Sequence, residues 1–202
     1  MVSPVERASS APAGRWRVLV EGASDAAALA ALAPRLGRDL GRAEVVPMGG
    51  ITNLRAQLAA AASDGVRTAG LYDAAEERVV RRALAVLTAV AADDVKLTAV
   101  AADDVDPEAH HLFRCVRDLE DELIRACTPD GVLAVLAEHG DLARFRAFQR
   151  QPFQRPRPLD AQLRRFLGTT SGRKLAYAGR LAAVVPPERT PTPIRRLLDV
   201  VA

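Results

Sequence analysis

The 202-residue sequence predicts an α/β fold, a Rossmann-like parallel sheet with flanking helices, followed by a helical C-terminal region. Strand and helix signals alternate through the first half, which is typical of parallel strands joined by helices. From residue 130 onward, apolar residues recur at helical spacing and strand signals stop. Hydrophobic residues make up 49% and charged residues 26% of the chain, so it is able to bury a core.

Short β-rich segments in the first half are each ended by a turn residue or an acid. Gly22 ends the first, the pair Gly49-Gly50 ends the second, and Asp73 stands at the end of the third. A helix is expected after each of these segments, with Ser24 as the N-cap of the first helix. The expected strands are residues 16–21, 44–48, 68–72 and 111–116, and the expected helices of this half are 24–36, 53–64, 76–90 and 119–126.

The second half is predicted to be helical throughout, apart from a basic connector broken by prolines at residues 151–158. Ser171 is the expected cap of the longest of these helices, and Pro193 starts the last one. The helices are expected at 132–138, 142–150, 159–167, 172–185 and 193–201. The predicted organisation is therefore a flexible tail (1–15), an α/β domain (16–128) and a basic helical region (129–202).

Charge is distributed unevenly along the chain. Residues 1–140 carry a net charge of −6 and residues 141–202 a net charge of +9. An acidic part that holds metal ions and a basic part that meets a polyanion would give this pattern, as would an arginine-rich solvated surface. Only Lys96 and Lys174 are lysines, which suggests that an ammonium group is needed at those positions.

Composition also limits where the protein acts. The first fifteen residues have no apolar segment typical of a signal peptide, and no uncharged apolar run reaches the ~18 residues of a membrane span. Cys115 and Cys127 are expected to be buried thiols in a cytoplasmic protein. Residues 87–95 recur at 97–105, and one copy is expected to be a tolerated surface insertion.

Four carboxylates are expected at one edge of the predicted sheet. Glu21 and Asp73 end two strands, while Asp25 and Glu76 lie in the first turn of the helices that follow. Carboxylates that converge in this way repel each other unless cations intervene, and oxygen-only ligands suit Mg²⁺ or Mn²⁺. Asp25 and Glu76 are each also explained by the preference of acids for helix N-termini, but that preference does not account for Glu21 and Asp73.

These residues resemble a known family. Residues 18–25 (VLVEGASD), Met48-Gly49-Gly50 with Asn53, and residues 70–73 (GLYD) are similar to a TOPRIM domain, the metal-binding module of topoisomerases, primases and some nucleases. More narrowly, they resemble the TOPRIM domain of OLD-family (overcoming-lysogenization-defect) nucleases. The later segments 118–120 and 171–174 match further positions of that family.

The resemblance assigns roles to individual residues. Glu21 matches a glutamate that serves as metal ligand or general base, and Asp73 matches the first aspartate of the family's Asp-x-Asp motif. Asp25 matches an additional acid of OLD proteins, and Glu120 a glutamate that helps to complete a second metal site. Lys174 matches a lysine that steadies charge on the phosphate. Two divalent ions, Mg²⁺ or Mn²⁺, are therefore the expected cofactors.

The sequence departs from the family's pattern in two ways. Ala75 replaces the second aspartate of Asp-x-Asp, so Glu76 must substitute for it or the site is weakened. The sequence also lacks the phosphate-binding loop of the ATPase that OLD nucleases carry. The resemblance implies a metal-dependent DNA endonuclease or nickase; the alternative is a weakened TOPRIM module that binds DNA or a partner ATPase as a regulatory subunit. DNA, a separate ATPase subunit and a second copy of the chain are the expected partners.

Basic side chains of the helical region are expected to hold the DNA backbone without reading its sequence. Phenylalanines in the same region could stack on bases, but at helical spacing they are more often part of a core. Asp121 and Glu122 are expected on a solvated helix face. The expected DNA-binding residues are Arg155, Arg157, Arg164, Arg165 and Arg173, and the phenylalanines are Phe145, Phe148, Phe153 and Phe166.

Overall fold

The computed structural model describes residues 15–91, 101–168 and 171–202. The predicted tail, apart from Arg15, lies outside the described residues. So does the part of the sequence repeat between residues 92 and 100, and the side chain of Ser171, the expected helix cap, is likewise outside them.

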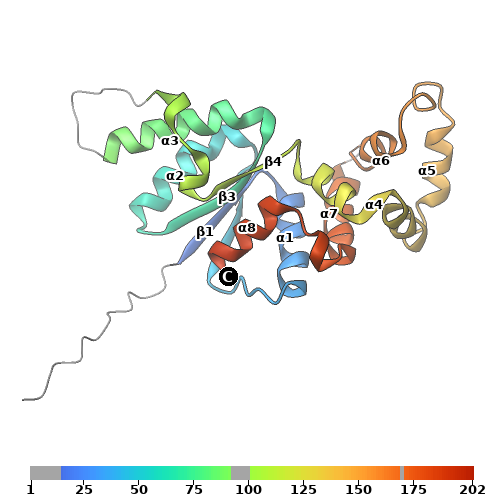
Figure 1. Cartoon of the computed structure of the whole chain (residues 1–202), viewed down its shortest axis with the longest axis horizontal. Helices are drawn as coiled ribbons and strands as arrows, with labels where there is room; N and C mark the ends of the chain where they lie inside the picture. The colour runs from blue at the N-terminus through green and yellow to red at the C-terminus, as the bar shows by residue number, and fades with distance from the viewer. Residues whose placement is uncertain (1–14, 92–100, 169–170) are drawn as a thin grey trace, which may run out of the picture.

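The predicted α/β fold is confirmed by a sheet of four parallel strands in the order β2-β1-β3-β4 (Figure 1). The strands are β1 (Trp16–Val20), β2 (Ala43–Pro47), β3 (Arg67–Asp73) and β4 (Leu112–Cys115). Leu19 of β1 pairs with Val46 on one side and with Gly70 on the other. A Cβ atom at Gly70 would lie 2.4 Å from the carbonyl oxygen of Leu19, so any other residue at this position of β3 would force the backbone to shift.

Helices cover both faces of the sheet, and the alternation of side chains along the strands explains how (Figure 1). Val18 and Val20 point into a core with α1 (Ala23–Arg35) and α8 (Thr192–Val201). Leu19, between them, points into a second core with α2 (Leu54–Ser63) and α3 (Glu77–Ala91). Both faces are dry, which fits a sheet built only of parallel strands.

The helical region extends to one side of the sheet and shares its larger core. It consists of α4 (Leu119–Glu138), α5 (Leu142–Gln149), α6 (Leu159–Leu167) and α7 (Ser171–Val184). Helix α7 packs along α1, and one continuous apolar cluster joins Leu29, Leu123, Phe145, Leu181 and Leu198. The last helix, α8, then returns to β3 and β4. The division into domains near residue 128 stays a prediction.

Helix α4 contains a break that the sequence predicts. Thr128 has φ 63° and ψ 157°, so the helix is interrupted just before Pro129, and two separate helices were expected here. Asp118 caps the first of them, because its carboxylate accepts a hydrogen bond of 2.8 Å from the amide of Asp121. The two halves of α4 therefore point in different directions while belonging to the same core.

The expected cap of α1 is wrong. The helix begins at Ala23, with Gly22 as its extended N-cap residue, so Ser24 already lies in the first turn. The carboxylate of Asp25 accepts a hydrogen bond of 3.0 Å from the amide of Gly22 and provides the local polar contact instead. This arrangement holds the turn between Glu21 and the helix in a fixed shape.

A buried polar pair stabilises the helical region. The hydroxyl of Tyr177 donates a hydrogen bond of 2.8 Å to Asp141, whose other oxygen accepts one of 3.0 Å from Arg144. Burial and the bond to Asp141 raise the pKa of Tyr177 to about 12. The hydrogen bond from Tyr177 lowers the pKa of Asp141, so the pair stays in the ionised-acid and neutral-phenol form.

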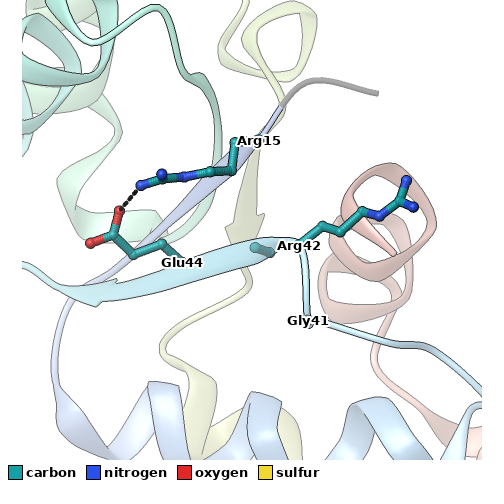
Figure 2. A pocket seen from close by; sticks show the side chains of 5 residues that line it. Arg15, Gly41, Arg42 and Glu44 are labelled. Atoms are coloured by element: carbon teal, nitrogen blue, oxygen red, sulfur yellow. Dashed lines mark ion pairs between the residues drawn. The ribbon is translucent and has the colours of Figure 1, made fainter. Parts of the chain in front are cut away.

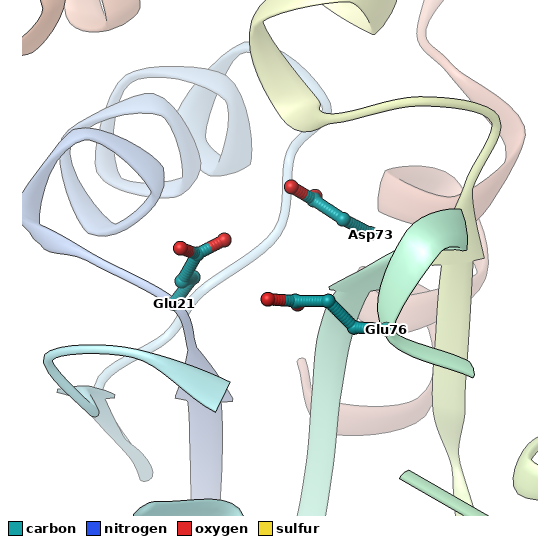
Figure 3. Close-up of side chains that lie close together, drawn as sticks. All are labelled: Glu21, Asp73 and Glu76. Carbon is teal, nitrogen blue, oxygen red and sulfur yellow. The ribbon is translucent and has the colours of Figure 1, made fainter. Parts of the chain in front are cut away.

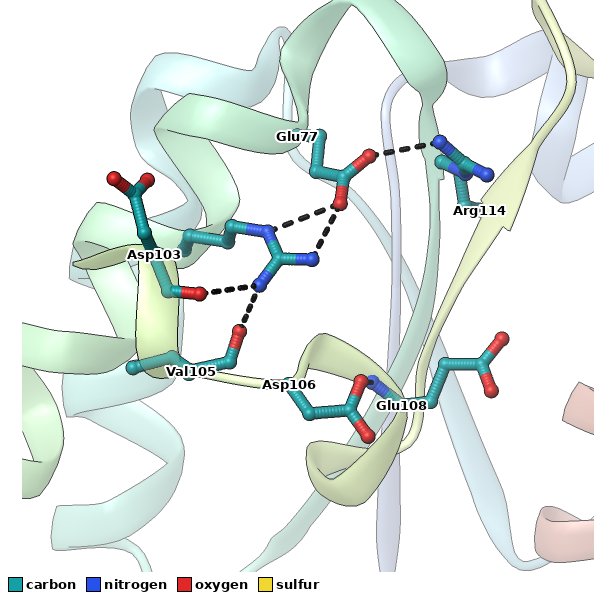
Figure 4. A network of polar contacts seen from close by, with 7 residues as sticks. Glu77, Asp103, Val105, Asp106, Glu108 and Arg114 are labelled. Carbon is teal, nitrogen blue, oxygen red and sulfur yellow. Dashed lines mark hydrogen bonds and ion pairs between the residues drawn. The ribbon is translucent and has the colours of Figure 1, made fainter. Parts of the chain in front are cut away.

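A second network fixes the chain before β4 (Figure 4). Arg81 of α3 donates two hydrogen bonds to Glu77, at 3.0 and 2.6 Å, and contacts the backbone carbonyls of Asp103 and Val105. Arg114 of β4 bonds the other oxygen of Glu77 at 2.9 Å. The hydrogen bonds from Arg81 lower the pKa of Glu77, which keeps this carboxylate charged. The network ties α3, the segment after residue 100 and β4 together.

Within the described residues, helices are too short or too polar to cross a membrane.

Candidate active site

The candidate site lies where the strand order of the sheet reverses. The chain leaves β1 through α1 to reach β2 on one side, and β3 lies on the other side of β1. Such a switch point leaves a crevice beyond the carboxyl ends of the two central strands. Glu21 follows β1 directly and Asp73 is the last residue of β3, so the topology brings both acids to this crevice.

The two glycines after β2 position Glu21. The amides of Gly49 and Gly50 donate hydrogen bonds of 3.0 and 3.2 Å to the backbone carbonyl of Glu21. Their φ angles are 72° and 120°, in the region that favours glycine. The side chain of Asn53 closes the turn with a bond of 2.8 Å to the carbonyl of Met48. These contacts explain why the Met-Gly-Gly sequence and Asn53 accompany the acids.

Glu21, Asp73 and Glu76 form a compact group of carboxylates (Figure 3). One oxygen from each lies within 4.8 Å of the others, and the three side chains point toward one another from different elements. Glu76 belongs to a 3-10 turn, Ala74–Glu76, directly after β3. Ala75 is exposed and has no polar atom to contribute, so Glu76 completes the group in its place.

The electrostatics of this group fit a cation. Burial, followed by the charges of Glu21 and Asp118, raises the pKa of Asp73 to about 7. Burial and the charge of Glu21 also raise the pKa of Glu76, and one of its oxygens is buried with no hydrogen-bond partner among the described residues. No ion pair of the described residues includes any of the three acids. The residues therefore fit a divalent ion held by oxygen ligands.

The remaining residues predicted to bind metal or to act in catalysis form a second group beside the first. Asp25, Glu120 and Lys174 line one small pocket between α1, α4 and α7. Burial raises the pKa of Glu120 to about 7, and the nearby charge of Lys174 opposes this shift. Burial likewise raises the pKa of Asp25, although the hydrogen bond from Gly22 and the charge of Lys174 lower it. One oxygen of Glu120 is buried without a partner in the described structure.

Asp118 is a residue of this region that was not expected among the site residues. Its carboxylate pairs with Arg164 of α6 and contributes to the raised pKa of Asp73. Asp118 thus lies between the acidic group and the basic helices. Its position directly after the fourth strand and its place in the motif of residues 118–120 were the available signals.

The expectation that Glu122 lies on a solvated helix face is wrong. Glu122 is 5% exposed, and its carboxylate accepts a hydrogen bond of 2.8 Å from the amide of Val116. Its other oxygen pairs with Arg125 at 2.6 Å, and Asp121 pairs with the same arginine at 3.1 Å. Glu122 therefore fixes the turn between β4 and α4 that carries Asp118 and Glu120.

The five arginines expected to bind DNA do not share one environment. Arg155 and Arg157 are exposed on the connector between α5 and α6. Arg165 is exposed on α6, whereas Arg164 is paired with Asp118. The guanidinium of Arg173 lies 4.2 Å from the centre of the Phe166 ring. A pocket between the β4–α4 turn and α6 collects several of these side chains, and its lining consists of Arg117, Asp121, Arg157, Asp160, Ala161, Arg164 and Arg165.

Three of the four phenylalanines are part of the core, as expected. Phe145 and Phe166 are buried with ring centres 5.2 Å apart, and Phe148 packs against both. Phe153 differs, because it is 82% exposed on the connector. The expectation that Phe153 packs in the core is therefore wrong.

A larger hollow lies away from these acids, beside the edge strand β2 (Figure 2). It is lined by Arg15, Gly41, Arg42, Ala43 and Glu44. Glu44 and Arg15 form an ion pair at 3.9 Å, while Arg42 points away from them. The only acid in the lining is already paired, so this hollow offers no group of side chains for catalysis.

A sheet of four parallel strands with acids at its switch point, flanked by helices and joined to a basic helical region, defines the class of the fold as α/β with a helical C-terminal part. The chain has the fold of the C-terminal region of OLD proteins. It matches that region of the Xanthomonas campestris pv. campestris OLD protein, phased with iodine, with a TM-score of 0.66 and 24% identity over 95% of each chain. It matches the C-terminal region of the Burkholderia pseudomallei OLD protein with a TM-score of 0.63 and 21% identity, over 94% of this chain and 97% of the other. No family model and no curated protein matches the sequence.

Proposed function

We propose that this protein is a divalent-metal-dependent DNA nuclease that hydrolyses phosphodiester bonds as an endonuclease or nickase. The convergence of Glu21, Asp73 and Glu76, none of which forms an ion pair among the described residues, carries this proposal. The likeness of the fold to the C-terminal region of OLD proteins supports it.

The roles of the side chains follow from their places. Glu21, Asp73 and Glu76 would hold one Mg²⁺ or Mn²⁺, and Asp25 and Glu120 lie where they could help to hold a second. Bound divalent ions supply Lewis-acid stabilisation of phosphate charge and activation of water. Lys174, next to Asp25 and Glu120, provides an ammonium group for negative charge that develops on the phosphate.

The basic helices would bind the DNA backbone. Arg155, Arg157 and Arg165 are exposed, and charges of this kind contact phosphates without sequence preference. Arg164 and Arg173 have partners within the protein and would act mainly by shaping this surface. A separate ATPase subunit and a second copy of the chain are further proposed partners.

Plasmid cleavage tests the proposal. Supercoiled plasmid is incubated with the purified protein and Mn²⁺, Mg²⁺ or EDTA, beside the variants Glu21→Gln and Lys174→Ala. The expected result is nicked or linear product that requires metal and is lost in both variants. The matched controls are Glu138→Gln and Arg146→Ala, which change exposed charges outside the site and should cleave like the wild type.

Ala75 favours a second candidate function, a weakened TOPRIM module that binds DNA or a partner ATPase as a regulatory subunit. This candidate predicts no cleavage by the wild type with any metal, although a gel shift still shows DNA binding. Cleavage that survives both Glu21→Gln and Lys174→Ala would place the active site elsewhere and contradict the first proposal.

A further inference from the structure

The connector between α5 and α6 presents an aromatic ring to solvent. Phe153 is 82% exposed, the highest value among the exposed large hydrophobic side chains of the described residues. A phenyl ring in water leaves apolar area unburied, which a binding partner would cover. The ring has no hydrogen-bonding group, so its contact with a partner must be made by its flat face or edge.

The connector is held in one shape. The buried side chain of Gln162 donates hydrogen bonds of 2.9 Å to the carbonyls of Gln154 and Arg157, and it accepts one of 2.6 Å from Gln149. Pro152, Pro156 and Pro158 further limit the backbone. Because this shape is set before binding, little conformational entropy is lost when Phe153 meets a partner.

The charges around Phe153 indicate the kind of partner. Arg150, Arg155 and Arg157 are exposed, and none of the ion pairs among the described residues includes them. Arg155 donates to the carbonyl of Arg150 at 2.9 Å, and Arg157 donates to the carbonyl of Phe153 at 3.1 Å, each through Nε. These bonds fix the two guanidinium groups on the connector that carries Phe153.

The basic surface continues from the connector toward the acidic group. Arg157 also lines a pocket in which arginines outnumber acids, the other lining residues being Arg117, Asp121, Asp160, Ala161, Arg164 and Arg165. Arg164 pairs with Asp118, whose charge acts on Asp73. A strand whose base lies on Phe153 would therefore find further arginines for its phosphates in this pocket, between the connector and the turn that carries Asp118.

We propose that Phe153 stacks on an unpaired base of single-stranded DNA, while Arg155 and Arg157 hold the adjacent phosphates. An aromatic ring next to cationic side chains is the arrangement that binds single strands, because every base offers a face for stacking. In a duplex the bases are already stacked, so the ring has no base to cover. The inference rests on the proposed action on DNA and extends it to a preference for unpaired nucleotides.

Fluorescence of Phe153→Trp in EDTA, where no cleavage is expected, tests this contact directly. The native Trp16 is buried in the core and provides a constant background. A mixed-sequence single strand should quench the new indole strongly, and the blunt duplex made with its complement should quench it weakly. The control is Val86→Trp, which places an indole on exposed α3 away from the connector and should not be quenched.

Affinity measurements separate stacking from burial of any apolar group. Phe153→Ala and Phe153→Leu should each weaken single-strand binding by about tenfold, with a much smaller effect on duplex binding. Phe153→Tyr should bind like the wild type. Arg155→Gln with Arg157→Gln should instead weaken both forms of DNA and reduce the dependence on salt.

The outcomes are distinguishable from those of the cleavage assay. Unchanged fluorescence of Phe153→Trp at saturating single strand, equal quenching of Val86→Trp, or wild-type affinity of Phe153→Ala would each overturn the stacking contact. An absence of any single-strand binding would overturn it as well. Loss of metal-dependent cleavage with the quenching intact would instead count against the proposed nuclease alone.

Discussion

Replacement of Asp73 by asparagine should stabilise the metal-free protein at alkaline pH. The folded state raises the pKa of Asp73 from 3.8 to about 7, because the side chain is partly buried beside Glu21, Asp118 and Glu76. The folded protein therefore holds this proton more tightly than the unfolded chain does. Below about pH 4 the residue is protonated in both the folded and the unfolded state, so it does not reduce the free energy of unfolding. As the pH rises toward 7, the unfolded chain loses this proton while the folded protein still holds it, and the free energy of unfolding falls.

The size of the effect follows from the shift in pKa. About three units correspond to about 4 kcal/mol in the free energy of unfolding, since one unit is 1.36 kcal/mol. Asp73 is partly open to solvent, which screens its interactions, and roughly half of this value is expected. For a chain of this length, ~2 kcal/mol corresponds to a rise in melting temperature of about 4–8 °C.

Thermal unfolding followed by circular dichroism measures this effect. In EDTA, Asp73→Asn should melt above the wild type at about pH 8 and together with it near pH 4. Added Mg²⁺ or Mn²⁺ should increase the free energy of unfolding of the wild type at pH ~8 by about 2.7 kcal/mol at a hundredfold excess over the dissociation constant, and its melting temperature should rise accordingly. The same addition should stabilise Asp73→Asn much less, because a ligand carboxylate is missing.

The exposed Glu138→Gln serves as the control for removal of one negative charge, and it should follow the wild type at every pH. The reasoning is refuted if Asp73→Asn shows the wild-type pH profile in EDTA. It is also refuted if Asp73→Asn and the wild type gain the same stability from divalent ions. Either result would mean that Asp73 does not experience the repulsion that its position implies.

Two further substitutions test the packing that holds the site. Gly70→Ala should lower the free energy of unfolding by about 1–3 kcal/mol in a denaturant titration, because its methyl group meets the Leu19 carbonyl. The control is Gly172→Ala, whose methyl group meets no atom within 4 Å and should leave the free energy of unfolding unchanged. Equal effects of the two changes would contradict this account of β3. Tyr177→Phe should lower the free energy of unfolding by about 1–2 kcal/mol in the same titration, because Asp141 loses a buried hydrogen-bond donor. A variant as stable as the wild type would show that water fully replaces the hydroxyl.

Much of the fold could be predicted from the sequence because each element carries a local signal. The strand from residue 68 ends at Asp73 as expected, and the helix after Asp118 stops at Thr128, just before Pro129. The return of α8 to β3 and β4 was not predicted. Periodicity shows that a helix has an apolar face, but it does not show which distant element covers that face.

The candidate site could be predicted as far as its acids follow strands. Parallel strands place their carboxyl ends at one edge, so the meeting of Glu21 with Asp73 follows from topology. The errors concern side chains whose environment depends on tertiary structure. Glu122 is buried because it binds the amide of Val116, and Phe153 is exposed because the connector turns its ring away from the core. The spacing of residues along a helix predicts neither the burial of Glu122 nor the exposure of Phe153.

The anchoring of Arg81 has a consequence for how the chain varies in length. Because this arginine holds the carbonyls of Asp103 and Val105 against α3, the chain that leads into β4 is fixed at these two residues. A ten-residue duplication, such as the one between residues 87 and 105, can therefore be inherited without moving the sheet.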